Sequence, residues 1–504
     1  MNIRIILKTI GAVLNLTAAL LLLPLACALY FKENPFPYIN TMVIALFSGL
    51  ILSNIKTKAK TFFAKEGFVT VGLVWICIAL VSAIPFVLSK DIPNYIDAFF
   101  ETVSGLTTTG ATCVTNIEAL TRAGLFWRSF THWIGGMGVL VFITAILPKD
   151  SDSVIHIMRA EVPGPSLSKL VPKLGETARI LYMLYIFLTI TEAIILKLCG
   201  MSAYEALLHA FATAGTGGFS TRNASIAAFH SKQIEWIIGV FMLLFAANFN
   251  LFFFISIRKF KLVFKNEELR WYIAIVIIAT LLITVGIMPD SPFKNEIIYS
   301  PQVLRQMRNA FVNIDKTFPD AIRDAFFHVS SIISTTGFTT KNYVAWPVYT
   351  HYITLILMLI GGCAGGTGGG PKVSRVVMLV KSIFSDVESL VNPHVVPNVS
   401  FEGKYINKET KHSIYLFFVL YILILSVGVF FLTLNGFDLE TTFSSALTCI
   451  SNVGPGLGLV GPMGNYSIYT GFSKIVLSML MLFGRLEIYA MLILFSPKTW
   501  KYNS

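Results

Sequence analysis

The sequence predicts an all-α polytopic membrane protein in which one unit is repeated four times. Three observations lead to this prediction: an apolar composition, a series of apolar stretches long enough to cross a bilayer, and a hydroxyl–glycine motif that recurs in register. Of the 504 residues, 55% are hydrophobic and only 13% are charged, and the mean hydropathy is +0.71. A soluble protein cannot cover its surface with so few charges, so soluble classes are excluded.

Apolar stretches of spanning length recur along the whole chain, and we count about ten of them by length. The stretch at 41–55 is short for a span. The stretches lie near residues 8–32, 41–55, 68–89, 128–147, 180–200, 233–257, 271–288, 350–362, 412–434 and 472–495.

Lysine and arginine residues gather after the second, fourth, sixth and last stretches. By the positive-inside rule, these loops and both termini are expected to be cytoplasmic. The net charge of +12 therefore indicates topology and contact with membrane lipid headgroups. Because the charge is scattered between spans, no nucleic acid partner is expected. The residues are Lys56, Lys58, Lys60 and Lys65, then Lys149, Arg159, Lys169 and Lys173, then Arg258, Lys259, Lys261, Lys265 and Arg270, and finally Lys498 and Lys501.

A glycine set among hydroxyl residues occurs three times and, in a weaker form, a fourth time. The copies TTTGAT, GTGGFST, STTGFTT and CISNVGPGLG align on Gly110, Gly218, Gly337 and Gly454. Matches at several other offsets indicate an internal repeat. Thirteen residues before the first three glycines stand Asp97, Glu205 and Asp324, and nine residues before all four stand Glu101, His209, His328 and Ser445.

Each unit is predicted to contain a span, a short helix, a glycine-containing loop and a second span. The short helix cannot cross a bilayer, so it is predicted to be re-entrant. The acid at its start suits the positive end of the helix dipole, and its negative end leads into the loop. The alternative, that each loop only caps its helix, would suffice for one copy but is disfavoured by four copies in register.

The loops have the chemistry of a cation filter. Non-helical backbone is tolerated at membrane depth where it is buried or lines a water-filled cavity. Glycine lets successive carbonyls turn towards one axis, and rings of such oxygens replace the hydration shell of a cation. The predicted filter residues are Thr108, Thr109, Gly110, Thr216, Gly217, Gly218, Thr335, Thr336, Gly337, Asn452, Val453 and Gly454.

A glycine-rich stretch, GGCAGGTGGGPK at 361–372, interrupts the predicted span of the third unit. It does not fit a phosphate loop, because Pro371 separates Gly370 from Lys372 and no cytosolic strand precedes it. Close helix packing through small residues explains one or two glycines but not this density. We therefore expect a flexible intramembrane loop beneath the filter.

Arg485 lies in the middle of the last predicted span, with Glu487 two residues further on. Intramembrane charges are costly and usually face a pore or a partner. The alternative is a buried ion pair that braces neighbouring helices.

With these motifs the sequence resembles the Trk/Ktr/HKT superfamily of potassium transporters, and within it the Trk-type membrane subunits (TrkH/TrkG). The resemblance covers essentially the whole chain. It depends on the four loops, the last of which lies in SNVGPGLG (451–458), and on four further segments: HWIGGMGVLVFITAILP (132–148), RAEVPGP (159–165), IGGCAGGTGGGPKVSR (360–375) and MLFGRLEIYAMLILF (481–495).

The resemblance implies four membrane–pore-helix–membrane repeats with pseudo-fourfold symmetry after two extra N-terminal spans. The implied boundaries are 1–66 for the extra spans, 67–150 for repeat 1, 151–266 for repeat 2, 267–400 for repeat 3 with the glycine-rich gating loop, and 401–504 for repeat 4.

It also implies potassium preference, because glycine stands at the key position of all four loops. Asn452 and Val453 replace the hydroxyl pair in the fourth loop, which is a departure from the other three. Arg485 is placed below the filter in the permeation path, as an electrostatic barrier. The implied gate residues are Gly361, Gly362, Gly365, Gly366, Thr367, Gly368, Gly369, Gly370, Lys372 and Arg485.

The expected function is potassium uptake across the bacterial cytoplasmic (inner) membrane. K+ is the expected transported ion, and no tightly bound organic cofactor is expected. The resemblance implies a homodimer on a cytosolic nucleotide-binding regulatory subunit, a TrkA-like ring. One alternative is a sodium- or proton-coupled cation symporter, which would need inverted repeats and paired intramembrane acids. Another is a non-transport membrane protein such as an enzyme; no GxSxG, HExxH or aspartate pair fits, so no enzymatic activity is expected.

Overall fold

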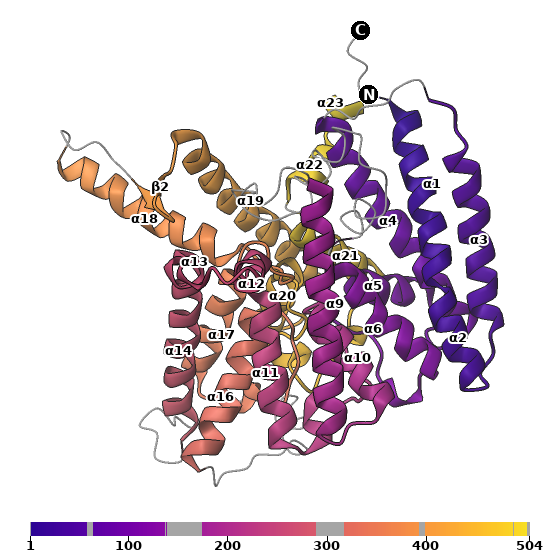
Figure 1. Cartoon of the computed structure of the whole chain (residues 1–504), viewed down its shortest axis with the longest axis horizontal. Coiled ribbons are helices and arrows are strands. Elements are labelled where there is room, and N and C mark those ends of the chain that lie inside the picture. Colours follow the sequence, from indigo (N-terminus) through magenta and orange to yellow (C-terminus); the bar gives the residue numbers. More distant parts are fainter. Residues whose placement is uncertain are drawn as a thin grey trace.

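The structure, a computed structural model, describes residues 2–57, 64–136, 138, 174–288, 317–392, 399–486 and 488–500. Within these residues the regular secondary structure is helical apart from one short hairpin (Figure 1). The basic loop predicted after the fourth span, the segment 159–165 and Glu487 lie outside the described residues.

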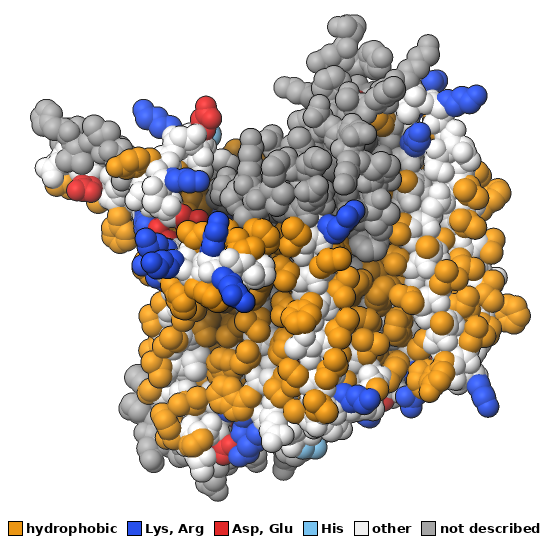
Figure 2. Space-filling view, viewed as in Figure 1, with side chains coloured by type: hydrophobic (Ala, Val, Ile, Leu, Met, Phe, Trp, Pro, Cys, Tyr) orange, Lys and Arg blue, Asp and Glu red, His pale blue; other side chains and the backbone are white. Residues whose placement is uncertain are grey.

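In the described part of the chain, six apolar helical segments are long enough to cross a membrane, or seven if one bent pair is counted as a span. Figure 2 shows hydrophobic side chains in a broad band across the visible face, with lysines and arginines above and below it. This distribution suits a surface in contact with lipid. The six are α1 (Ile3–Leu20) with α2 (Leu22–Tyr30), α3 (Phe36–Ser53), α4 (Ala64–Leu88), α9 (Leu174–Leu198), α14 (Glu267–Ile287) and α19 (Lys408–Thr433).

The expectation of about ten continuous spans is therefore too high for the described residues, because several predicted spans are short or broken. The axes of α11 and α12 form an angle of 94°. At this bend the side chain of Asn248 caps the start of α12 by accepting a hydrogen bond from the Asn250 N–H. The last span breaks near Ile488, whose φ is 54°. The short or broken helices are α6 (Arg122–Gly136), α11 (Lys232–Ala246), α12 (Phe249–Ser256), α17 (Val348–Ile360), α21 (Gly471–Arg485) and α22 (Tyr489–Phe495).

Four short helices occupy the positions expected for the re-entrant segments. Three of them begin at side-chain caps, Asn94, Ser202 and Asp438, each of which accepts a hydrogen bond from an N–H in the first turn. They are α5 (Tyr95–Leu106), α10 (Ala203–Ala214), α16 (Phe318–Ile333) and α20 (Leu439–Ser451).

The third short helix differs from the sequence expectation, which placed Asp324 at its start. The helix α16 begins earlier, at Phe318, and the acid in its first turn is Asp320. Asp324 lies in the second turn, where it is buried and 3.0 Å from the guanidinium of Arg323. The repeat register aligns the glycines correctly but not the start of this helix, because its length differs from that of the other three.

A helical arm extends from the main body at the third unit (Figure 1). It consists of α18 (Val373–Val391) and the start of α19, with a small antiparallel hairpin of β1 (Ser400–Phe401) and β2 (Lys404–Tyr405) between them. The two remaining α-helices of the described residues, α13 (Phe260–Lys265) and α23 (Pro497–Trp500), are short.

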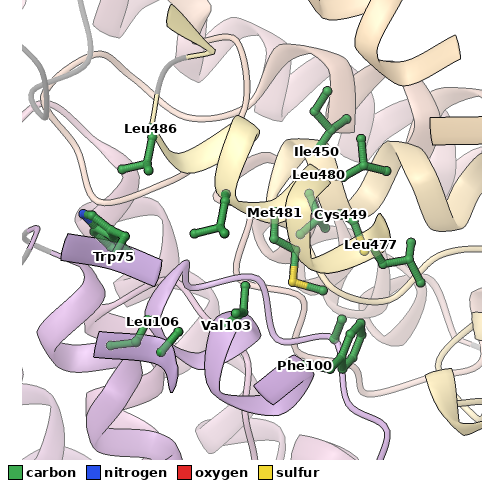
Figure 3. Close-up of a cluster of buried hydrophobic side chains, with 14 of the residues drawn as sticks. Trp75, Phe100, Val103, Leu106, Cys449, Ile450, Leu477, Leu480, Met481 and Leu486 are labelled. Atoms are coloured by element: carbon green, nitrogen blue, oxygen red, sulfur yellow. The ribbon is translucent and has the colours of Figure 1, made fainter. Parts of the chain in front are cut away.

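The core joins the first part of the chain to the last. Figure 3 shows Phe100 and Val103 of α5 near Leu477 and Met481 of α21, and Trp75 of α4 below Leu486. In the same way α22 packs against α4, and α21 packs against α5 and α20. The chain therefore closes on itself, and all four short helices direct their C-terminal ends into one interior region.

Candidate functional site

The four loops that follow the short helices share one backbone conformation. Each has a positive φ at its aligned glycine and again two residues earlier. At the earlier position three loops carry threonine, a β-branched residue that rarely adopts a positive φ. Such strain persists only where the surroundings impose it, and it is typical of functional sites. The φ values are 56° and 78° for Thr108 and Gly110, 53° and 78° for Thr216 and Gly218, 59° and 78° for Thr335 and Gly337, and 56° and 100° for Asn452 and Gly454.

One hydrogen bond is repeated in all four loops. The N–H of the residue before each aligned glycine donates to the carbonyl five residues earlier, near the C-terminus of the short helix. This bond fixes each loop to its own helix, so the helix end and the loop form one unit. The bonds are Thr109 to Ser104 (2.9 Å), Gly217 to Ala212 (2.8 Å), Thr336 to Ser331 (2.9 Å) and Val453 to Thr448 (2.9 Å).

The four glycines contact one another's loops in a closed order. A Cβ atom added at each glycine would lie within 3.0 Å of a carbonyl oxygen in the next loop, closer than real Cβ atoms come. The first loop meets the second, the second the third, the third the fourth, and the fourth the first. The pairs are Gly110 with Gly217, Gly218 with Thr336, Gly337 with Val453, and Gly454 with Thr109.

The fourth loop, which lacks the hydroxyl pair, is held by an amide instead. Asn452 is fully buried, and its Nδ2 donates to Thr109 Oγ1 of the first loop (2.9 Å) and to the Met481 carbonyl of α21 (2.9 Å). Asparagine also tolerates the left-handed backbone better than threonine does. The replacement therefore keeps the loop conformation and adds a direct bond between the last loop and the first.

The glycine-rich stretch 361–372 lies against the loops from the helix side. The Gly369 N–H donates to Thr335 Oγ1 at 2.6 Å. A Cβ at Gly368 would lie 2.8 Å from the Ser334 carbonyl, and one at Gly369 would lie 2.7 Å from the Ser451 carbonyl. Glycine is thus required at these positions because no side chain fits between the stretch and the loops.

Two anchors hold the glycine-rich stretch in place. At the break between α11 and α12, the N–H of Cys363 donates to the Ala246 carbonyl (2.9 Å) and the N–H of Thr367 to the Phe245 carbonyl (3.1 Å). On the other side, Glu268 of α14 is buried, and its Oε1 accepts from the N–H of Ala364 (2.7 Å) and of Ser374 (3.2 Å).

The two basic residues predicted to belong to this region both contact the stretch. Lys372 is 3% exposed, and its ammonium donates to the Gly368 carbonyl. Arg485 donates to the Thr367 carbonyl (2.8 Å), to the Gly136 carbonyl (2.9 Å) and to the Gly135 carbonyl. Arg485 is the last residue of α21, where the predicted last span breaks, so its side chain reaches backbone carbonyls of the stretch and of α6.

A cavity lies on the opposite side of the loops. It is lined by all four aligned glycines and by residues that follow them, whereas the glycine-rich stretch contacts residues that precede them. The ring of loops therefore separates two regions, a cavity on one side and the stretch on the other. Among the lining residues are Ala111, Thr112, Arg128, Phe219, Ser220, Thr339 and Pro455.

The structure brings together every predicted filter and gate residue, all of which are described. It also adds residues that the sequence reading did not single out for this site, chiefly Glu268 and Arg128. For Arg128 a signal was available, because it is a charge at the start of an apolar stretch. Glu268 follows another glutamate at a span end, where acids are unremarkable.

Fold and site together define an integral membrane protein in which four glycine-containing loops form a closed ring between the helices. The model of the TrkH family, described as a cation transport protein, matches residues 36–502, and the chain belongs to this family. The resemblance seen in the sequence is thereby confirmed.

Several relatives are similar along their whole length. The chain is 35% identical over 512 residues to the Trk system potassium uptake protein TrkH of Escherichia coli K12, covering 99% of this chain and 100% of that protein. It is 31% identical over 509 residues to the Trk system potassium uptake protein TrkG of the same strain, covering 99% of each. The crystal structure of the potassium transporter TrkH from Vibrio parahaemolyticus superposes with a TM-score of 0.84 at 31% identity, covering 99% of this chain and all of that one.

Proposed function

We propose that this protein takes up potassium ions across the bacterial cytoplasmic membrane through the ring formed by its four loops. The relatives named as potassium uptake proteins support the ion. The observation that carries the proposal is the closed order of contacts, in which each aligned glycine meets a carbonyl of the next loop. A cation at the centre would be surrounded by backbone oxygens, which replace its hydration shell.

The filter assignment is tested by Gly337→Ser. The new Cβ would collide with the Val453 carbonyl, so the third and fourth loops must move apart. We expect the preference for potassium over sodium to fall, measured from the reversal potential of purified protein in liposomes with potassium on one side and sodium on the other.

Gly436→Ser is the matched control. Gly436 also has a positive φ (72°), but nothing lies within 4 Å of its added Cβ. The control therefore introduces similar backbone strain without touching the ring. If Gly337→Ser folds and keeps the wild-type preference, the ring is not the filter.

We further propose that the glycine-rich stretch is the gate. It lies directly against the third and fourth loops, and its contacts are backbone hydrogen bonds and short side-chain contacts that can be exchanged without unfolding a helix. Arg485 and Lys372 add positive charge at the same level, which opposes the passage of a cation.

We also propose the broader organisation that the family resemblance implies. It comprises four pseudo-symmetric repeats after two extra N-terminal spans, with both termini cytoplasmic, in a homodimer on a cytosolic nucleotide-binding ring. Four loops with one conformation support the repeats, and α1 and α3, which precede the first unit, support the extra spans. Titration of single cysteines at each terminus with an impermeant reagent tests the topology: labelling from outside intact cells would contradict it.

A further inference from the structure

A buried ion pair lies behind the first two loops. Arg128 of α6 places Nε 2.6 Å from Oε1 of Glu101 in α5, and the two side chains are 2% and 0% exposed. Ions are stable at such depth only when they are paired and their remaining hydrogen-bonding groups are satisfied. The partners of this pair are therefore informative.

The carboxylate of Glu101 holds the first loop just after its glycine. Both of its oxygens accept from Thr112 Oγ1, at 2.9 and 3.1 Å, and Oε2 also accepts from the Cys113 N–H at 3.0 Å. Thr112 and Cys113 are the second and third residues after Gly110.

The guanidinium of Arg128 holds the second loop at the same level. Its Nη1 donates to the Ser220 carbonyl at 3.1 Å, and its Cζ lies 3.5 Å above the ring of Phe219. Phe219 and Ser220 immediately follow Gly218. The ion pair therefore connects the first loop to the second through charge-assisted hydrogen bonds, which are shorter and stronger than neutral ones.

The equivalent position in the other three units makes a different contact. Nine residues before the glycine, these units carry histidine or serine, each buried and hydrogen-bonded to a hydroxyl. Of these three contacts only that of His209 reaches a loop, and it is the loop of its own unit. The contacts are His209 Nε2 with Ser220 Oγ (3.0 Å), His328 Nε2 with Thr354 Oγ1 (2.9 Å) and Ser445 Oγ with the Tyr469 hydroxyl (2.8 Å).

We propose that Glu101 and Arg128 are a positioning pair that determines ion selectivity, by holding the first and second loops at a fixed separation on the cavity side of the ring. This inference rests on the proposed filter. A ring whose loops cannot approach one another cannot close around the smaller sodium ion. A fully satisfied buried network supplies that rigidity.

The pair also controls charge at the cavity. Arg128 is one of the lining residues, and Glu101 neutralises it at contact distance. Glu101→Gln should therefore leave an uncompensated positive charge beside the ion path, which lowers the rate of potassium entry. The double variant Glu101→Gln with Arg128→Met removes both charges, so it weakens the positioning without adding repulsion.

The experiment measures the permeability ratio of potassium to sodium from reversal potentials, together with potassium flux per folded protein, in liposomes of purified full-length protein. We expect the ratio to fall about tenfold in both variants, the effect of losing roughly one charge-assisted hydrogen bond. Flux should fall in Glu101→Gln and recover in the double variant. Arg128→Lys, which keeps the charge but loses the forked donor, should show an intermediate ratio.

A second ion pair on the same short helix provides the control. Lys474 Nζ lies 2.6 Å from Asp97 Oδ1 near the N-terminal end of α5. The Asp97 carbonyl also accepts from Cys113 Sγ at 3.4 Å, and the substitution keeps this backbone group. Asp97→Asn with Lys474→Met should keep the wild-type ratio even if it lowers thermal stability.

The outcomes separate the two proposals. If the Glu101 and Arg128 variants keep the wild-type ratio while Gly218→Ser loses it, the pair is only structural and the inference is overturned. If Gly218→Ser also keeps the ratio, the filter assignment itself fails. If only the single variant changes, the effect is electrostatic and positioning is refuted. Should Glu101→Gln fail to fold, an unchanged ratio in Arg128→Lys is sufficient to refute the inference.

Discussion

Arg485 is the residue whose substitution should change ion flux most directly. Its guanidinium donates to the Thr367 carbonyl of the glycine-rich stretch and to the Gly135 and Gly136 carbonyls at the end of α6. It therefore has two expected effects: it adds a positive charge below the ring, and it holds the stretch against α6. We expect Arg485→Ala to raise potassium flux by both routes.

The magnitude can be worked out for each route. A hydrogen bond to a charged group contributes about 1.5–3 kcal/mol, so losing the Thr367 contact alone would raise the fraction of protein with the stretch displaced about 10- to 150-fold. A unit charge about 4 Å from the ion costs roughly 4 kcal/mol at an effective dielectric near 20, an upper figure because water screens it. An increase in flux of at least about tenfold is therefore expected.

The assay is potassium flux per folded protein in liposomes, compared among Arg485→Ala, Arg485→Gln and Arg485→Lys. Lysine keeps the charge but cannot reproduce the forked hydrogen bonds. If the charge alone controls flux, the lysine variant should have the wild-type flux. If the hydrogen bonds that hold the stretch against α6 also contribute, its flux should lie between those of wild type and the alanine variant. A fall in flux together with a fall in melting temperature in the alanine variant would show that Arg485 is a structural brace, and the reasoning would be refuted.

Two further predictions concern the anchors of the stretch and the ring. Glu268→Leu removes the oxygen that accepts from the N–H groups of Ala364 and Ser374, and each unsatisfied buried group costs about 1–3 kcal/mol, so basal flux should rise and Glu268→Gln should restore most of the wild-type behaviour. Unchanged flux in a folded leucine variant would exclude this anchor. Asn452→Ala removes the bond to Thr109 and strains a residue with φ 56°, so melting temperature and potassium preference should both fall. Asn452→Gly relieves the strain only; if it restored the preference, the amide would have no role.

The four loops illustrate how far sequence reasoning reaches. Their positions could be predicted because the requirement is local: a glycine with positive φ at a constant distance from the end of a short helix. The start of the third short helix could not be predicted from that register. The aligned acid, Asp324, lies in the second turn and pairs with Arg323, whereas the helix begins at Phe318. The four copies share the features that the loop conformation requires. The length of the short helix is not one of these features, so it differs between copies.

The contacts that hold the glycine-rich stretch could not be predicted from the sequence. Its density of glycine indicates irregular backbone at membrane depth, but not what holds that backbone. Glu268 is 96 residues from Ala364, and both are unremarkable in their own segments. The end of α21 at Arg485 could not be predicted either, because it lies within a continuous apolar stretch whose composition indicates an unbroken span.

The sequence by itself determined the membrane class, the register of the four glycine-containing loops and the places where the backbone leaves the helix, because each depends on composition or spacing within a short segment. The tertiary structure decided which loop adjoins which, how Asn452 replaces a hydroxyl pair, and which backbone carbonyls the guanidinium of Arg485 contacts. These depend on atoms from distant segments: Asn452 and Thr109 are 343 residues apart, and Arg485 and Gly136 are 349 apart. No local sequence pattern predicts these contacts, because they form only when distant segments of the chain pack together.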